Sequence, residues 1–230
     1  MTSEARARFE RIYTLLRERI CLLDYPPGMR LREEDLAEEF DTSRTPIRRV
    51  LARLEDEGYL RSVHGVGTIV TDIDIASLEQ VYRLRVELSE LIGKLSPIEP
   101  DEDAKRAFAA MKTRCEALVR TPSQRAFAQL NMDFFHLLMT LTENEPLQEF
   151  SERLYYQTTR IWLKRAAGED GTEETLASEI GFFLREVSDI AAAVACGALE
   201  SVGQIRRAHV AMSFARLKKR AGEEVEAASF

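Results

Sequence analysis

The apolar positions in the first 71 residues change their period several times, which predicts several short elements. Apolar side chains recur at helical spacing from Phe9 to Leu23, and the sequence YPPG near the end of this stretch favours a turn. A second, short helix is predicted over residues 33–40, with Leu36 turned inward. This part of the chain should therefore begin with two helices separated by a turn.

A third helix is predicted to begin near Ser43 or Thr45, both suitable N-cap residues, and to end at Gly58. Pro46 lies in its first turn, where the missing N–H removes no helical hydrogen bond. The stretches YLRSV and GTIVT then flank the residues HGV, a pattern typical of two short strands joined by a tight turn. The predicted order is helix, helix, helix and hairpin.

From residue 77 to residue 220 the apolar positions keep a helical period, and no strand pattern interrupts it. Helices are predicted over residues 77–95, 102–119, 123–142, 145–166, 174–196 and 198–219. The short connections between them favour an all-α antiparallel helical bundle. The fold class is mainly α, with a first domain over residues 1–74 and a helical second domain over residues 75–230.

Composition narrows the class of protein only slightly. The 230 residues are 45% apolar and 31% charged, which is ordinary for a globular chain, and the net charge of −7 argues against nonspecific binding to nucleic acid. The first residues are polar, the longest apolar run is too short for a membrane span, and the three cysteines lack metal-ligand spacing. We therefore expect a cytoplasmic protein.

The third predicted helix concentrates positive charge in an acidic chain, because no acidic residue occurs between Asp41 and Glu55. The apolar side of this helix is formed by Ile47, Val50, Leu51 and Leu54, and the opposite side by Thr45, Arg48, Arg49, Ala52 and Arg53, with Arg44 at the tip. Such a helix can enter the major groove of DNA end-on, because arginine binds guanine O6 and N7 and small hydroxyl groups bind phosphates. The alternative is a solvated arginine face on a structural helix.

The sequence PPGMRLREEDLAEEFDTSRTPIRRVLARLEDEGYL, followed by HGVGTIV, resembles the winged helix-turn-helix of GntR-type bacterial transcriptional regulators. By this resemblance, DNA is contacted by Ser43, Arg44, Thr45 and Arg48 on the recognition helix and by His64 and Gly65 on the hairpin, or wing. Arg49 stands where an acid is usual, which adds positive charge on the side that faces DNA. Two further departures are Asp41 in place of a usual glycine and an acidic Glu34 where some members have a basic contact. Taken alone, the hairpin could also be an ordinary one with a surface histidine.

The stretches VYRLRVELSELIGKL, FFHLLMTLTENEPL and EVSDIAAAVACGALESVGQIRRAHV resemble the all-helical FCD-type effector domain of the FadR-like branch. The resemblance implies a homodimer that holds a small ligand in the bundle, and in many members a divalent metal bound by an Asp or Asn and three histidines. The corresponding positions are here Asn131, Phe135, Val187 and His209. One imidazole and one amide are too few for a tight transition-metal site, so we expect no metal and no other cofactor.

Arg85 projects from the centre of the apolar stripe of the predicted helix 77–95, and a buried guanidinium group needs an anion. We expect a pocket for a small carboxylate effector whose residues are Arg85, Asn131, Phe135, Val187 and His209. In this pocket Arg85 would bind the carboxylate with two hydrogen bonds. The alternatives are that Arg85 pairs with an internal acid or reaches a dimer interface, and that His209 is a core histidine.

Together these patterns favour a ligand-responsive transcriptional regulator that binds double-stranded operator DNA as a homodimer. The second hypothesis is a helical enzyme. We assign no catalytic residues, because the three histidines are far apart in the sequence and no catalytic or phosphate-binding motif occurs. The third hypothesis is a dimeric protein-interaction module without sequence-specific DNA binding, which the acid-free arginine face disfavours.

Overall fold

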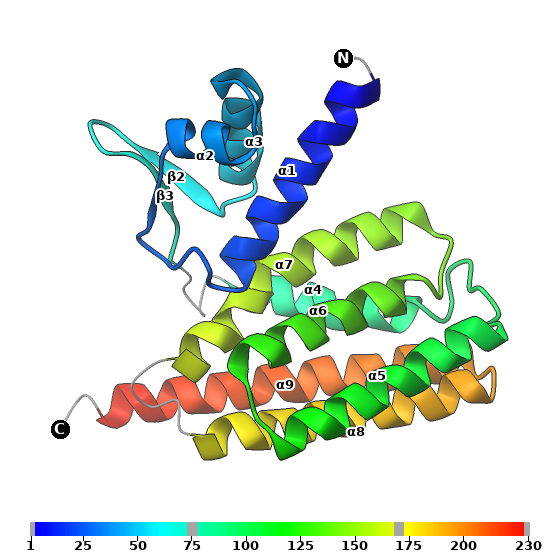
Figure 1. Ribbon diagram of the computed structural model, residues 1–230. Coiled ribbons are helices and arrows are strands. Elements are labelled where there is room, and N and C mark those ends of the chain that lie inside the picture. The colour runs from blue at the N-terminus through cyan, green and yellow to red at the C-terminus, as the bar shows by residue number, and fades with distance from the viewer. Residues whose placement is uncertain (1–2, 73–77, 168–172, 228–230) are drawn as a thin grey trace. The chain divides into compact units, whose positions relative to one another are not determined.

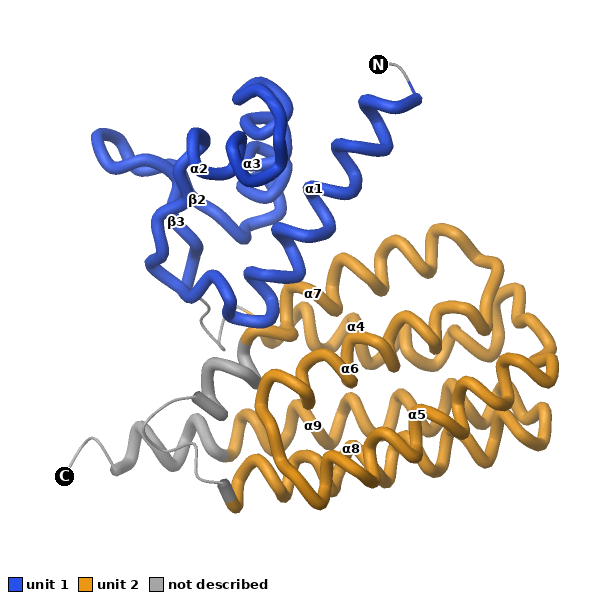
Figure 2. The backbone as a smooth tube through the Cα atoms, in the orientation of Figure 1, with its two compact units in different colours: residues 1–73 blue, residues 74–230 orange. Residues whose placement is uncertain are grey.

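The computed structural model describes residues 3–72, 78–167 and 173–227, and within them the side chains of residues 3–72, 78–160 and 174–219. The chain forms two compact units, residues 1–73 and residues 74–230 (Figure 2). The first contains three helices and the small sheet, and the second contains the remaining described helices. The predicted mainly α fold class, with a winged N-terminal part and a helical bundle, is confirmed.

The helices of the first unit are α1 (Ser3–Cys21), α2 (Glu33–Glu39) and α3 (Arg44–Asp56) (Figure 1). α1 and α2 both pack against α3, because each presents one apolar stripe to it. The buried side chains of these helices include Ile12, Leu16, Ile20, Leu36, Ile47, Val50, Leu51 and Leu54. Asp41 connects α2 to α3 with a φ of 45°, a left-handed conformation that Asp tolerates better than most residues.

Gly58 ends α3, as the sequence predicts. Its φ is 82°, and its N–H donates to the carbonyl of Glu55 at 2.9 Å. The N–H of Tyr59 donates to the carbonyl of Leu54, also at 2.9 Å. Together these bonds form a C-terminal cap that favours glycine at residue 58. The chain thereby turns directly into the sheet.

The hairpin consists of the antiparallel strands β2 (Leu60–Val63) and β3 (Gly67–Val70), with residues 64–66 at its tip. A third strand, β1 (Arg30–Leu31), pairs with β3, so the strand order is β1-β3-β2. The sequence pattern did not predict β1, because two residues are too few to show alternation. The Glu55 carboxylate accepts hydrogen bonds from the N–H and the hydroxyl of Ser62 and so ties the hairpin to α3.

The second unit contains six helices in the part of the chain that is described. They are α4 (Glu79–Leu91), α5 (Glu102–Arg120), α6 (Gln124–Met139), α7 (Glu145–Ala167), α8 (Glu173–Ala195) and α9 (Leu199–Ala227). α4 packs against α9 and α7, α5 against α6 and α8, and α8 against α9 (Figure 1). The core of this bundle is apolar and includes Phe108, Phe134, Leu138, Ile180, Val187, Ile190 and Val194.

None of the helices within the described ranges is long and apolar enough to span a membrane.

Candidate functional site

α3 presents a basic face on the outside of the first unit. Its apolar residues are buried, whereas Arg44, Thr45, Arg48 and Arg49 are exposed. The first turn of α3 contains no acidic residue. Ser43 occupies the N-cap position, but its side chain makes no capping hydrogen bond, so the hydroxyl group is available for another partner. The residues predicted for the recognition helix therefore share one exposed surface.

Two of these arginines make ion pairs with α2. Arg44 Nη2 lies 2.8 Å from Glu34 Oε1, and Arg48 Nε lies 2.6 Å from Glu33 Oε2. The side chains of both arginines are more than half exposed, and exposed ion pairs stabilise a fold only slightly. Either guanidinium group can therefore exchange its carboxylate for a phosphate or a base edge at little cost in stability.

Arg53 lies on the same side of α3 but has a structural role. Its guanidinium group pairs with Glu10 at 3.1 Å and with Glu57 at 3.2 Å, and lies 3.8 Å from the centre of the Tyr13 ring. These contacts join α1 to the end of α3. Arg53 is therefore less available for DNA than Arg44 or Arg48, each of which makes one exposed ion pair with α2.

His64 and Gly65 lie at the exposed tip of the hairpin, where Gly65 has a φ of 75°. Next to the hairpin is a hollow of about 320 Å³, whose wall includes Arg30, Arg32 and Arg44 together with the acidic Glu33 and Glu34. Arg30 and Arg32 were not predicted as site residues from the sequence. The available signal was a pair of arginines two positions apart, immediately before the acidic helix α2.

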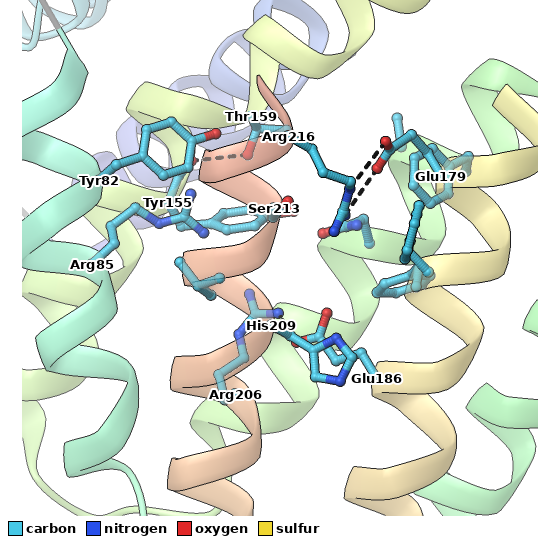
Figure 3. A pocket seen from close by; sticks show the side chains of 16 residues that line it. Tyr82, Arg85, Tyr155, Thr159, Glu179, Glu186, Arg206, His209, Ser213 and Arg216 are labelled. Carbon is cyan, nitrogen blue, oxygen red and sulfur yellow. Dashed lines mark hydrogen bonds and ion pairs between the residues drawn. The ribbon is translucent and has the colours of Figure 1, made fainter. Parts of the chain in front are cut away.

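The second unit contains a cavity of about 80 Å³, large enough for several water molecules or a small organic molecule (Figure 3). Its wall combines aromatic residues with charged and polar ones from five helices. They are Tyr82, Arg85, Phe127, Ala128, Asn131, Tyr155, Thr159, Glu179, Phe182, Phe183, Glu186, Arg206, His209, Val210, Ser213 and Arg216. Three predicted residues, Arg85 on α4, Asn131 on α6 and His209 on α9, are brought together here.

Arg85 has no carboxylate ion pair among the described residues. Its guanidinium group donates a hydrogen bond to the Thr158 hydroxyl and lies 5.3 Å from the ring centre of Tyr82 and 5.4 Å from that of Tyr155. Burial lowers the pKa of Arg85 below its ordinary value, and the charge of Arg206 lowers it further. Because an arginine in a protein stays protonated, the pocket wall carries a positive charge without a paired acid.

The other guanidinium groups of the pocket are paired. Arg206 on α9 makes an ion pair with Glu186 on α8, and the two side chains are 7% and 9% exposed. Arg216 binds Glu179 through two hydrogen bonds, of 3.3 Å and 3.1 Å, which are visible in Figure 3. The wall thus holds three guanidinium groups and two carboxylates, an excess of one positive charge before His209 is counted.

Two neutral side chains of the wall also have unused hydrogen-bonding capacity. The Asn131 amide and the Ser213 hydroxyl form no side-chain hydrogen bond with any described residue. His209 Nε2 lies 3.8 Å from Asp189 Oδ2, which is longer than a hydrogen bond. These three groups could bind polar substituents of a ligand.

Phe135 and Val187 are not among the residues that line this pocket. Phe135 stacks on Tyr155 with 4.1 Å between the ring centres and lines a smaller neighbouring cavity. Val187 is fully buried in the core of the bundle. Val187 is turned into the core by its apolar neighbours, whereas Phe135 is held by its stack on Tyr155 and shares the smaller cavity with Arg85 and Arg206.

Four charged residues of the pocket were not predicted from the sequence, namely Arg206, Arg216, Glu179 and Glu186. A signal was present, because Arg206, His209, Ser213 and Arg216 recur every three or four positions and therefore share one face of α9. Which residues face them from α8 depends on how the two helices pack. That packing could not be derived from periodicity.

A divalent metal of the kind found in similar helical domains does not fit these residues. Phe135 and Val187 supply no donor atom, and no group of three His, Cys, Asp or Glu side chains is suitably placed to bind a metal ion within the described residues. In the pocket, Glu186 and Glu179 are held in ion pairs by Arg206 and Arg216. Asn131 and His209 are the donors of the described wall outside these pairs, which is too few for a tight transition-metal site.

Comparison with known families identifies both units. The model of the gntR family of bacterial regulatory proteins matches residues 8–70, and that of the FCD domain matches residues 80–212. An uncharacterized HTH-type transcriptional regulator of Bacillus subtilis, YdhC, is 27% identical over 143 residues, which cover 62% of this chain and 64% of that protein. A similar regulator of Mycobacterium tuberculosis is 30% identical over 156 residues, which cover 60% of this chain and 63% of the relative. The chain thus spans slightly less than two thirds of either relative.

Among solved structures, the E. coli protein McbR/YncC is similar in fold. The TM-score is 0.78 at 17% sequence identity, with 96% of this chain and all of the other chain covered. At that identity the similarity supports the fold alone.

Proposed function

The chain belongs to the gntR family of bacterial regulatory proteins and carries an FCD domain, and from this premise we propose how it works. It binds operator DNA as a homodimer through α3 and the hairpin, in the cytoplasm, and responds to a small organic anion in the pocket of the second unit. The family consists of transcriptional regulators rather than enzymes, which decides against the enzyme hypothesis.

The observation that carries the DNA-binding part of the proposal is the division of α3 into two faces. Its apolar face is buried in the first unit, so Arg44, Arg48 and Arg49 remain exposed on one side. Ser43 and Thr45 add hydroxyl groups at the helix N-terminus, where a phosphate also meets the positive end of the helix dipole. His64 and Gly65 at the hairpin tip would contact the neighbouring groove.

The effector part of the proposal is supported by Arg85. Its guanidinium group lies in the pocket wall and has no paired carboxylate among the described residues. Such a group favours an anionic ligand. Its planar guanidinium group can bind a carboxylate through two parallel hydrogen bonds. Asn131 and His209, in the same wall, would orient the rest of the ligand.

We propose further that this guanidinium group, and not a bound metal, holds the negative charge of the effector. Phe135 and Val187 stand at two positions where similar domains have histidine ligands, and neither side chain has an atom that binds a metal, because Phe135 is stacked on Tyr155 and Val187 lies in the apolar core. Metal analysis of the purified protein by mass spectrometry should therefore show less than stoichiometric zinc, nickel and manganese. A stoichiometric metal that is lost on replacing His209 would contradict this assignment.

A homodimer would allow two α3 helices to read two half-sites of a pseudo-palindrome. Exposed apolar side chains on the second unit, among them Leu84, Phe150 and Met212, are available for a partner copy. Sedimentation equilibrium should give twice the mass of the chain.

α4 carries Arg85 and follows the first unit in the sequence, so an effector that shifts α4 could alter the placement of the DNA-binding units.

The deciding experiment is selection of bound sequences from a random duplex DNA library with the full chain, followed by anisotropy titrations on the enriched site. Arg44→Ala and Arg48→Ala should each weaken binding of that site about tenfold or more, because each removes a contact to a base or phosphate. Arg106→Ala on α5 removes an exposed arginine from the second unit and should bind as the parent does. Unchanged binding in Arg44→Ala and Arg48→Ala would show that α3 is not the reading helix. A library without any enriched sequence would favour the protein-interaction hypothesis.

A further inference from the structure

The charges and rings of the pocket in the second unit specify its ligand more narrowly than a small organic anion. We infer that the effector is a flat aromatic monocarboxylate, bound with its carboxylate at Arg85 and its ring against the aromatic side chains of the wall. The inference rests on the proposed function, because it assigns the ligand of the same pocket.

The charges of the pocket wall favour a ligand with one negative charge. Glu186 already neutralises Arg206, and Glu179 already binds Arg216 through two hydrogen bonds. Arg85 is left as the guanidinium group without a paired acid in the described wall. A second carboxylate on the ligand would find no second unpaired guanidinium group in the described wall, and displacing Glu186 or Glu179 would leave that acid buried without a partner, which costs more than a new pair contributes.

The aromatic residues of the wall favour a ligand with a flat ring. Tyr82 stacks on Phe214 with 4.5 Å between ring centres, and Tyr155 stacks on Phe135 with 4.1 Å. Each tyrosine ring is thus held in place by a second ring behind it. Arg85 lies within reach of both tyrosines, so a carboxylate bound there places the attached group beside these rings (Figure 3).

The opposite wall has the same character. Phe183 contacts Phe127 edge-on at 5.6 Å between ring centres, and Phe182 also lines the cavity. Rings that meet faces and edges of other rings are stabilised beyond the area that they bury. A polyhydroxy acid could pair some of its hydroxyl groups with Asn131, Ser213 and His209, but those facing the rings would lack hydrogen-bond partners, which costs free energy for each group.

The test uses isothermal titration calorimetry on the full chain without DNA. Benzoate is the probe, and three molecules each change one property: benzamide lacks the charge, phthalate adds a second carboxylate, and acetate lacks the ring. Benzoate should bind about tenfold tighter than each of the three, as expected for a charged hydrogen bond and a buried ring. Absence of benzoate binding at millimolar concentration, or tighter binding of phthalate or acetate, would overturn the inference.

Variants connect the binding to the pocket. Arg85→Met should weaken benzoate binding about tenfold or more and leave benzamide binding unchanged, because only the anion uses the guanidinium group. Arg114→Met on α5 is the matched control, because Arg114 pairs with Asp133 at the surface and does not line the cavity. Unchanged benzoate binding in Arg85→Met would show that the anion is bound elsewhere, and an equal loss in both variants would show a general effect of the removed charge. Either result would contradict the assignment to Arg85.

The outcomes separate this inference from the proposed function. If the chain selects an operator but does not bind benzoate, the ligand class is wrong and the DNA-binding assignment stands. If benzoate binds through Arg85 but no DNA sequence is enriched, the ligand class stands and the regulatory function fails.

Discussion

Gly203 of α9 lies directly against the backbone of Glu90 of α4. A Cβ atom on Gly203 would lie 3.1 Å from the carbonyl carbon of Glu90 and still closer to its oxygen. A second close contact follows, because a Cβ atom on Gly93, two residues after the end of α4, would lie 2.6 Å from the carbonyl carbon of Leu199 at the start of α9. The two helices therefore meet backbone to backbone, and this contact sets their separation beside the pocket.

Gly203→Ala and Gly93→Ala should each lower the free energy of unfolding by more than about 2 kcal/mol, because the added methyl group forces the helices apart. Gly181→Ala in α8 is the control, since a Cβ atom there meets nothing within 4 Å. This control should gain about 0.5–1 kcal/mol from better helix propensity. Urea denaturation followed by circular dichroism measures all three. A Gly203→Ala variant as stable as Gly181→Ala would contradict the close packing.

The buried ion pair between Arg206 and Glu186 leads to a second prediction. Arg206→Met leaves the Glu186 carboxylate buried without its guanidinium partner, which should cost about 3–5 kcal/mol of unfolding free energy. The double variant Arg206→Met/Glu186→Leu should recover most of that loss, because both charges are then absent. Arg85→Met removes a guanidinium group without stranding a carboxylate and should not destabilise the ligand-free protein. Equal destabilisation by Arg85→Met and Arg206→Met would argue against this difference in pairing.

The carboxylates of Glu33 and Glu34 on α2 should lower the affinity of the protein for DNA. Glu33 and Glu34 hold Arg48 and Arg44 in ion pairs that a DNA phosphate must replace. Glu33→Gln and Glu34→Gln should therefore each raise the affinity for DNA several-fold and steepen its dependence on salt. Glu38→Gln makes the same charge change on the same helix, at an exposed carboxylate outside the ion pairs described, and should have a smaller effect. Anisotropy titrations at several salt concentrations measure this, and three equal effects would indicate a general charge effect.

Arg30 and Arg32 next to the hairpin should contribute to affinity without contributing to sequence preference. They line a hollow with Arg44 and are exposed, as expected for contacts to phosphate. Arg30→Ala and Arg32→Ala should weaken binding of specific and nonspecific duplexes by the same factor and lower the salt slope by about one unit each. A change in the selected sequence would instead indicate contact with a base.

The reactivity of the three cysteine thiols depends on whether each is buried or exposed. Burial raises the pKa of the Cys115 thiol to about 11, so at pH 8 only about one molecule in a thousand carries the reactive thiolate. Cys21 is also buried, whereas Cys196 is exposed. Iodoacetamide at pH 8 should therefore label Cys196 in the native protein and all three cysteines after denaturation, as peptide mass spectrometry would show. Rapid labelling of Cys115 in the native state would contradict its burial in the core.

Most of the secondary structure could be predicted because it depends on short-range periodicity. The two faces of α3 follow from the spacing of its own residues, and Gly58 ends the helix through hydrogen bonds within five residues of itself. β1 was not predicted, because its two residues acquire strand geometry only by pairing with β3, more than thirty positions further along the chain.

The sequence by itself determined the order of elements, the basic face of α3 and the three pocket residues Arg85, Asn131 and His209, since each is a polar residue on an apolar helix stripe. Only the tertiary structure decided which charges are paired. It placed Glu186 against Arg206 and turned Val187 into the core, and it left Arg85 without an acid in the described wall. The physical reason is that charge pairing depends on distances between side chains of different helices, whereas periodicity reports only the direction of each side chain around its own helix.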